Sequence, residues 1–177
     1  MKVTETYVRR LEISGVEGLD PIRVVLEDIG PGQGRINIEC WGESWANYWG
    51  GMGNSDLAEF FSSCSVQYLA GKMSSIPQMV FDPEGLIASL NQEVIRDRRK
   101  GFISQKEARK SYERITDLDP LPSTVDGLWY MANTMQEILG DEWWYRLPEK
   151  ANPDYVYLTK ILKAVQEALT RTKGGAA

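Results

Sequence analysis

The sequence of 177 residues contains no histidine, the side chain that most often transfers protons near neutral pH. The chain by itself therefore cannot form a Ser-His-Asp triad, a Cys-His pair or a histidine-ligated zinc or iron site. Cysteine is scarce as well, because Cys40 and Cys64 are the two in the chain, too few for a zinc ribbon or an iron–sulfur framework. We expect no catalytic residues, no metal site and no cofactor.

The sequence also lacks the features of an exported or membrane-spanning protein. Its N-terminus is polar and charged, so we expect no signal peptide. No run of about 18 apolar residues predicts a membrane span. Both cysteines lie in apolar segments, which favours buried free thiols in a reducing cytosol, with a single disulfide as the open alternative.

Positive charge is in the minority, with 20 Lys and Arg against 25 Asp and Glu, and the net charge is −5. The chain as a whole therefore has no electrostatic bias towards nucleic acid or an anionic membrane. Its 42% of hydrophobic residues and 25% of charged residues are typical of a folded globular protein. Since a domain has about 150 residues, we expect one domain covering residues 1–177.

The first 53 residues are rich in strand-forming residues. Runs at 3–14, 22–29 and 35–41 are separated by turn residues, and the third run alternates apolar with polar side chains. This pattern predicts an antiparallel three-stranded meander with one apolar face. From residue 54 to 172 the spacing of apolar residues is helical. We therefore expect an α+β fold in which a mostly helical C-terminal part covers the sheet, with residues 173–177 as a flexible tail.

Helix-capping signals mark where these helices begin. Asn54 or Ser55, Ser104 with Glu107, and Ser123 are candidate N-caps. Asp82-Pro83 and Asn152-Pro153 place proline in the first helical turn, and Gly101 and Gly140 end helices. The last helix has the apolar stripe Leu158, Ile161, Leu162, Val165, Ala168 and Leu169, which predicts core packing.

Motifs that resemble catalytic sites have simpler interpretations. Ser44 lies in a sequence like a nucleophile elbow, but the histidine base that such a serine needs is missing. Residues 30–34 join two strands as a hairpin turn, and residues 50–53 lack the lysine of a phosphate loop. The carboxylates, including Asp117 and Asp119, are interpreted as solvated or capping charges.

Four aromatic residues lie within nine positions beside the glycines of residues 50–53, and these are Trp41, Trp45, Tyr48 and Trp49. Spacings of four would bring the three tryptophans together if the segment were helical. The rings either pack beneath the sheet or form a partner-binding surface, because Trp and Tyr dominate interface hot spots. We predict that at least one of Trp45, Tyr48 and Trp49 is exposed at a partner contact.

The segment 96–114 is basic, whereas the N-terminal half of the chain is acidic. Its eight cationic residues are Arg96, Arg98, Arg99, Lys100, Lys106, Arg109, Lys110 and Arg114. Such a helical hairpin can contact the phosphates of a nucleic acid, and it can equally be the solvated face of two surface helices. Nucleic-acid binding through this segment is the alternative function of the chain.

Residues 18–53, above all 18–24, 30–36 and 48–53, resemble small accessory proteins of tailed bacteriophages and prophages, and residues 57–73 continue the resemblance. The resemblance brings no catalytic residues with it. It implies a phage product in the cytoplasm of the bacterial host that binds and modulates a host protein without being an enzyme. An anti-CRISPR-like or other anti-defence inhibitor would be of this kind.

Overall fold

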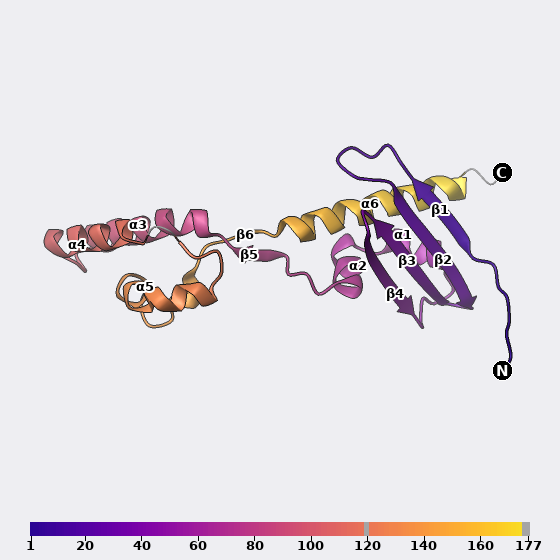
Figure 1. Ribbon diagram of the computed structural model, residues 1–177, viewed down its shortest axis with the longest axis horizontal. Coiled ribbons are helices and arrows are strands. Elements are labelled where there is room, and N and C mark those ends of the chain that lie inside the picture. Colours follow the sequence, from indigo (N-terminus) through magenta and orange to yellow (C-terminus); the bar gives the residue numbers. More distant parts are fainter. Residues whose placement is uncertain (119–120, 175–177) are drawn as a thin grey trace. The chain divides into compact units, whose positions relative to one another are not determined.

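The computed structural model describes residues 1–118 and 121–174, and the chain forms two compact units. The first, called here the sheet unit, consists of Met1–Gln78 and the segment from Pro153 onwards; the second, the helix unit, is Met79–Asn152. Figure 1 shows the elements of both units, and each unit is described by itself. Whether the chain unfolds as the one domain expected from its length stays a prediction.

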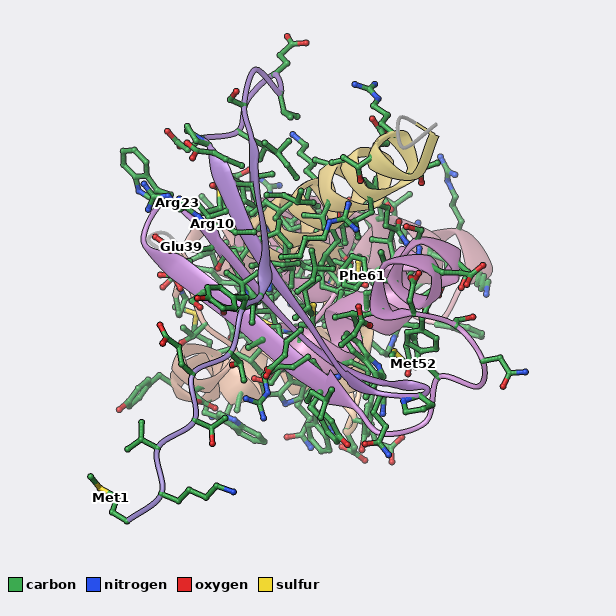
Figure 2. All side chains as sticks on the ribbon, turned by 90° about the vertical axis from the view of Figure 1, so that its right-hand side faces the viewer. Met1, Arg10, Arg23, Glu39, Met52 and Phe61 are labelled. Carbon is green, nitrogen blue, oxygen red and sulfur yellow. The ribbon has the colours of Figure 1, made fainter. Side chains whose placement is uncertain are left out.

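The sheet unit confirms the α+β prediction and corrects the number of strands. The sheet is an antiparallel meander of four strands in the order β1-β2-β3-β4. The strands are β1 (Arg9–Ile13), β2 (Ile22–Gly30), β3 (Gln33–Cys40) and β4 (Glu43–Trp49). The predicted first strand at 3–14 is too long, because residues 1–8 form an exposed segment ahead of β1 that ends at Met1 in Figure 2.

The fourth strand was missed because its pattern of aromatics is ambiguous. Residues four apart share a face in a helix and also in a strand. Here the segment is a strand in which Trp45 lies opposite Ile38 and Trp49 lies opposite Gly34. Trp41 and Gly42 form the turn before it, and both have positive φ angles, 53° and 79°, as a two-residue type I′ hairpin requires.

Three helices cover the apolar face of the sheet: α1 (Leu57–Ser63), α2 (Val66–Met73) and α6 (Pro153–Gly174). The last helix begins at Pro153, as predicted, and five residues of its predicted stripe are fully buried, while Ala168 is partly exposed. The core between the sheet and these helices includes Phe61, labelled in Figure 2. Fully buried members of this core also include Ile22, Val24, Ile36, Ile38, Leu57, Leu69, Leu158, Ile161, Leu162, Val165 and Leu169.

The other face of the sheet is solvated and carries pairs of opposite charge. Arg23 Nη1 lies 3.1 Å from Glu39 Oε1 on the neighbouring strand, and Arg10 lies on the same face (Figure 2). Two more ion pairs, Arg10–Glu12 at 3.6 Å and Arg35–Glu27 at 3.7 Å, join exposed side chains. These paired charges keep much of this face polar, and the ring of Tyr48 is exposed on it as well.

The first two helices are separate because each has its own cap. Asp56, rather than the predicted Asn54 or Ser55, caps α1 by accepting from the amide of Glu59 at 2.7 Å. Ser65 then caps α2. Between them, the side-chain amide of Gln166 donates to the carbonyls of Phe61 at 2.9 Å and Cys64 at 2.8 Å. A long-range contact from α6 thus satisfies carbonyls that a continuous helix would have bonded.

The two glycine-rich stretches meet each other. The amide of Met52 donates to the carbonyl of Gly32 at 2.7 Å, so the segment after β4 lies against the β2–β3 turn. A Cβ atom on Gly32 would come within 2.3 Å of the carbonyl oxygen of Gly53, which explains why the turn needs glycine there. The stretch at 30–34 is therefore a hairpin turn, as predicted.

The helix unit begins and ends with two short strands that the sequence analysis did not predict, β5 (Met79–Phe81) and β6 (Glu149–Ala151). They pair antiparallel, Met79 opposite Ala151, so the chain enters and leaves the unit at neighbouring positions. Between them lie α3 (Pro83–Lys100), α4 (Gln105–Thr116), the 3₁₀ helix η1 (Asp126–Met131), α5 (Ala132–Leu139) and the 3₁₀ helix η2 (Trp143–Arg146).

Most of the predicted helix boundaries in this unit are confirmed. Ser104 and Glu107 form a capping box at the start of α4, and Gly101 ends α3 with a φ of 76°. Gly140 ends α5. Ser123 does not cap a helix, because η1 begins at Asp126 with Val125 in the cap position. The unit has its own core, formed by Leu86, Leu90, Val94, Ala108, Ile115, Leu118, Leu128, Met135, Ile138, Leu139 and Trp143.

At the C-terminus, α6 continues to Gly174, two residues into the predicted tail, and residues 175–177 of that tail lie outside the described residues. Within residues 1–118 and 121–174, no helix is both long enough and apolar enough to pass through a lipid bilayer.

Candidate functional site

The structure separates the four aromatic residues predicted to bind a partner. Trp45 and Trp49 point into the core of the sheet unit and are buried. The indole N–H of Trp49 donates to the hydroxyl of Tyr68 at 3.1 Å, and its ring contacts Phe60 at a centroid distance of 5.7 Å. These two tryptophans therefore have the structural role that the sequence analysis left open.

The other two aromatics of that segment face solvent. Tyr48, on the opposite face of β4, is 49% exposed, and its hydroxyl lies 3.4 Å from the side-chain oxygen of Gln33. Trp41, in the turn between β3 and β4, is 76% exposed. Partner binding by this segment stays a prediction, and Trp41 and Tyr48 are the rings that are free to take part.

A second group of aromatics, which the sequence analysis missed, lies in the helix unit. Trp129, Trp143 and Trp144 contact one another, with centroid distances of 5.0 Å, 5.7 Å and 5.9 Å, and Tyr145 lies 5.8 Å from Trp144. Trp143 is buried beneath the others. Trp129, Trp144 and Tyr145 are 54%, 39% and 79% exposed, and we call these three rings the aromatic ledge.

The ledge carries the features of a protein-binding surface. Aromatic side chains bury a large area with few rotatable bonds, and Trp and Tyr are enriched among the residues that contribute most to binding. Three consecutive aromatics at 143–145 were a visible signal in the sequence. Only the fold brings Trp129 to them, because η1 and η2 both pack against α5.

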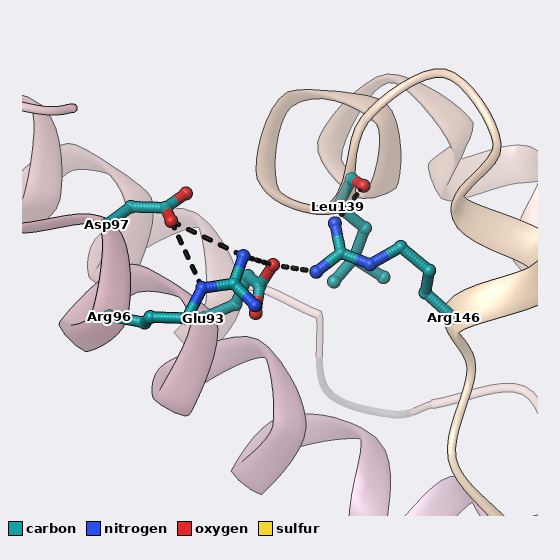
Figure 3. A network of polar contacts seen from close by, with 5 residues as sticks. All are labelled: Glu93, Arg96, Asp97, Leu139 and Arg146. Atoms are coloured by element: carbon teal, nitrogen blue, oxygen red, sulfur yellow. Dashed lines mark hydrogen bonds and ion pairs between the residues drawn. The ribbon is translucent and has the colours of Figure 1, made fainter. Parts of the chain in front are cut away.

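A polar network around Glu93 holds η2 in place (Figure 3). The carboxylate of Glu93, nearly buried on α3, accepts from the guanidinium groups of Arg96 and Arg146. Arg146, the last residue of η2, also donates to the carbonyl of Leu139 at the end of α5. Arg146 thereby ties the end of the ledge to two helices, and it is a positioning residue for the exposed rings.

Unpaired charges next to the ledge are acidic. Asp126 in η1, Glu142 before η2 and Glu149 after it are exposed, and none of them forms an ion pair with any described residue. The neighbouring cations are already paired, Arg146 with Glu93 and Lys150 with Asp82 at 3.4 Å. The segments that carry the ledge therefore combine exposed aromatic rings with exposed carboxylates that have no ion pair among the described residues.

The basic segment 96–114 forms the end of α3, the connecting turn and most of α4, and it is the second candidate for a binding surface. Three of its eight cations form ion pairs: Arg96 with Glu93 and Asp97, Arg109 with Glu113, and Arg114 with Glu137 on α5. The remaining five are exposed, and among the described residues none has an acidic partner; they are Arg98, Arg99, Lys100, Lys106 and Lys110. Lys100 also lies 5.9 Å above the exposed ring of Phe102.

Comparison with known protein families decides what kind of protein this is. The family model Phage_phiTE_072, a phage family, matches residues 1–171. The chain belongs to this phage family. The resemblance seen in the first part of the sequence thus extends over nearly all of it. No curated protein and no solved structure matched the chain.

Ser44 and Cys40, two of the side chains of this phage protein that could act as nucleophiles, are hydrogen-bonded to other side chains of the chain. The hydroxyl of Ser44 donates to Asn37 at 2.9 Å on the solvated face of the sheet. Both cysteines are free thiols. The sulfur of buried Cys40 lies 3.3 Å from the hydroxyl oxygen of Tyr157, and this hydrogen bond, together with desolvation, raises the pKa of Tyr157 to about 12. Burial raises the pKa of Cys64, which favours its less reactive thiol form.

Acidic residues are spread out rather than gathered. Across residues 1–118 and 121–174, no three His, Cys, Asp or Glu side chains lie close enough together to hold a metal ion. Asp117 caps the end of α4, whereas Asp119 lies outside the described residues.

Proposed function

We propose that this phage protein is a non-enzymatic binding protein that attaches to a bacterial host protein through the aromatic ledge. Three exposed rings on a buried tryptophan base carry the proposal, since exposed aromatic surface is costly in water and is typical of protein interfaces. Modulation of the host protein, in the manner of an anti-CRISPR or other anti-defence inhibitor, would take place in the cytoplasm of the bacterium.

Comparison of matched variants tests the proposal. The wild-type protein, Tyr145→Ala and Trp129→Ala are used as bait in a bacterial lysate. Tyr7→Ala provides the control, because Tyr7 is an exposed aromatic residue that belongs to the sheet unit and not to the ledge. A host protein recovered by wild type and control, but not by the ledge variants, is then purified. Its affinity should fall at least ~30-fold on loss of a central ring.

Two results would overturn this assignment. One is a host partner that binds all four baits equally well. The other is a host partner that both ledge variants still recover and that a Tyr48→Ala bait does not. Such a result would place the contact on the sheet unit instead. Melting temperatures close to that of wild type are needed for each variant, so that lost binding is not lost folding.

Binding of nucleic acid by the α3–α4 hairpin is a second candidate, and the five exposed cations without acidic partners favour it. Contacts to phosphates would weaken steeply as salt rises. Since the whole chain is acidic, we expect no shift of DNA or RNA in a gel at about 150 mM salt. A clear shift that disappears when Arg98, Arg99 and Lys110 are changed to Glu would favour this second function instead.

The proposal also implies that purified protein has no hydrolase or nuclease activity, with or without Mg²⁺ or Mn²⁺. Assays on peptide, ester and nucleic-acid substrates check this. Metal-stimulated cleavage that disappears in Asp117→Ala or Asp119→Ala would make the protein an enzyme and contradict the proposal.

A further inference from the structure

The aromatic ledge borders a pocket of about 260 Å³ within the helix unit. Trp144 and Tyr145 line it from η2, Phe81 lines it from β5, and Leu147 and Pro148 add apolar surface. The planes of Trp144 and Tyr145 are inclined by 51°, so the two rings present differently directed faces. The volume is below the roughly 300–1,000 Å³ of pockets for drug-sized ligands and suits one long side chain.

The pocket also has an acidic group. Glu149, an exposed residue of β6, contributes to the lining. The two cations closest to Glu149 in the sequence are paired with other acids, Arg146 with Glu93 and Lys150 with Asp82 at 3.4 Å. Two more exposed acids are close to the lining residues in the sequence: Asp126 follows the lining residue Val125, and Glu142 comes two residues before Trp144.

We infer that this pocket binds an arginine side chain of the partner protein, a refinement that rests on the proposed function. A guanidinium group can stack on the ring of Tyr145, the more exposed of the two lining aromatics of η2, and form two parallel hydrogen bonds to the carboxylate of Glu149. Arginine suits the pocket better than lysine, since its planar, weakly hydrated head group matches both a ring face and a carboxylate. A phosphate group is disfavoured by the same negative charges.

Two small probes of similar shape, one charged and one neutral, test with the full-length protein whether the pocket requires a positive charge. Nα-acetyl-arginine amide is titrated at low salt, and the indole and phenol resonances of Trp144 and Tyr145 are followed by NMR. Nα-acetyl-citrulline amide, which is neutral, is the matched probe. We expect a saturable shift with the arginine probe and an affinity for the citrulline probe that is at least ~10-fold weaker.

Conservative variants then assign the interaction to residues. Glu149→Gln should lower the affinity for the arginine probe by about 10-fold, because it removes the negative charge at this position and keeps the shape of the side chain. Glu167→Gln, an exposed acid on α6 in the sheet unit, makes the same change in net charge and should have no effect. Tyr145→Phe should retain the affinity and Tyr145→Ala should lose it, since the ring face rather than the hydroxyl makes the contact.

Several outcomes would overturn the inference. Equal affinity for both probes, or no effect of Glu149→Gln, would mean that the pocket does not select a guanidinium group. A dimer in sedimentation velocity that both Glu149→Gln and the double change Arg98→Glu, Arg99→Glu abolish would make a second copy the occupant. If the probes fail while ledge variants still lose the host protein, the arginine pocket is wrong and the proposed function stands.

Discussion

Trp41 holds a backbone conformation that tryptophan rarely adopts. Its φ of 53° lies in the left-handed region, which costs roughly 1–2 kcal/mol for a residue with a Cβ atom. The indole ring is largely exposed, so burial does not offset this cost. Strain retained at an exposed aromatic residue suggests a contact outside the chain, in line with the partner-binding prediction for this segment.

Trp41→Asn should therefore stabilise the protein by about 1 kcal/mol, because asparagine followed by Gly42 is the favoured pair for a type I′ turn. The midpoint of urea unfolding measures the gain. Gly42→Ala is the opposing control, since it introduces a Cβ atom at a φ of 79° and should destabilise the protein. If Trp41 contacts a partner, Trp41→Asn will raise stability and lower affinity together, whereas an unchanged affinity would remove Trp41 from the interface.

The capping box of α4 makes the free energy of unfolding depend on the protonation of one residue, Glu107. The backbone amide of Ser104 donates to the carboxylate of Glu107 at 2.7 Å, and this bond, with a contribution from the Ser104 hydroxyl, lowers the pKa of Glu107 below its ordinary value of 4.5. A lowered pKa means that the folded state favours the carboxylate. This contribution is present above pH 4.5 and is lost as the pH falls through the lowered pKa.

An NMR titration of the Glu107 side chain should thus give a midpoint below 4.5, and Ser104→Ala should move it upwards. The stability advantage of wild type over Glu107→Gln should also shrink as the pH is lowered from about 6 to about 3. A midpoint at or above 4.5, or a constant advantage, would mean that the capping box does not form in solution.

At the scale of elements, α6 ties the C-terminal segment to a sheet made by the N-terminal residues. Its buried stripe packs in the same core as α1, α2 and the strands, and Gln166 closes the end of α1. The helix is therefore an integral part of the sheet unit.

Leu162→Ala tests that role. Leu162 is fully buried, so truncation should lower the free energy of unfolding by about 2–5 kcal/mol. Lys163→Ala, one position along on the exposed face of the same helix, should change it by less than about 0.5 kcal/mol. Urea unfolding followed by circular dichroism compares the two. A midpoint unchanged by Leu162→Ala would show that the helix is not part of the core.

At the scale of the whole molecule, each unit has its own hydrophobic core. The core of the sheet unit takes residues from both ends of the chain, and the helix unit is an insertion whose two ends are paired as β5 and β6. Insertions with neighbouring ends can fold within a host domain without separating its parts.

Separate cores predict two unfolding transitions in calorimetry. Leu162→Ala should lower the midpoint temperature of the transition of the sheet unit. Leu90 is fully buried in the helix unit, so Leu90→Ala should lower the midpoint temperature of the other transition. A single transition that both variants shift equally would instead support the one cooperative domain expected from the length of the chain.

The sequence by itself determined the features that depend on a few neighbouring residues. Ser104 with Glu107, Gly101, Gly140 and Pro153 mark helix ends through contacts within one turn, and the structure has them where predicted. The alternation of apolar and polar residues in β3 indicated a sheet with one apolar face. The α+β class, and a phage resemblance that the family match confirms, were already readable at that level.

Only the tertiary structure decided which aromatics are core and which are surface. A spacing of four residues fits a helix and a strand equally, so pairing with β3 was needed to make residues 43–49 a strand and to bury Trp45 and Trp49. The aromatic ledge depends on contacts between segments far apart in the chain, Trp129 with Trp144 and Glu93 with Arg146. Such contacts arise from the packing of whole elements, which local sequence patterns do not encode.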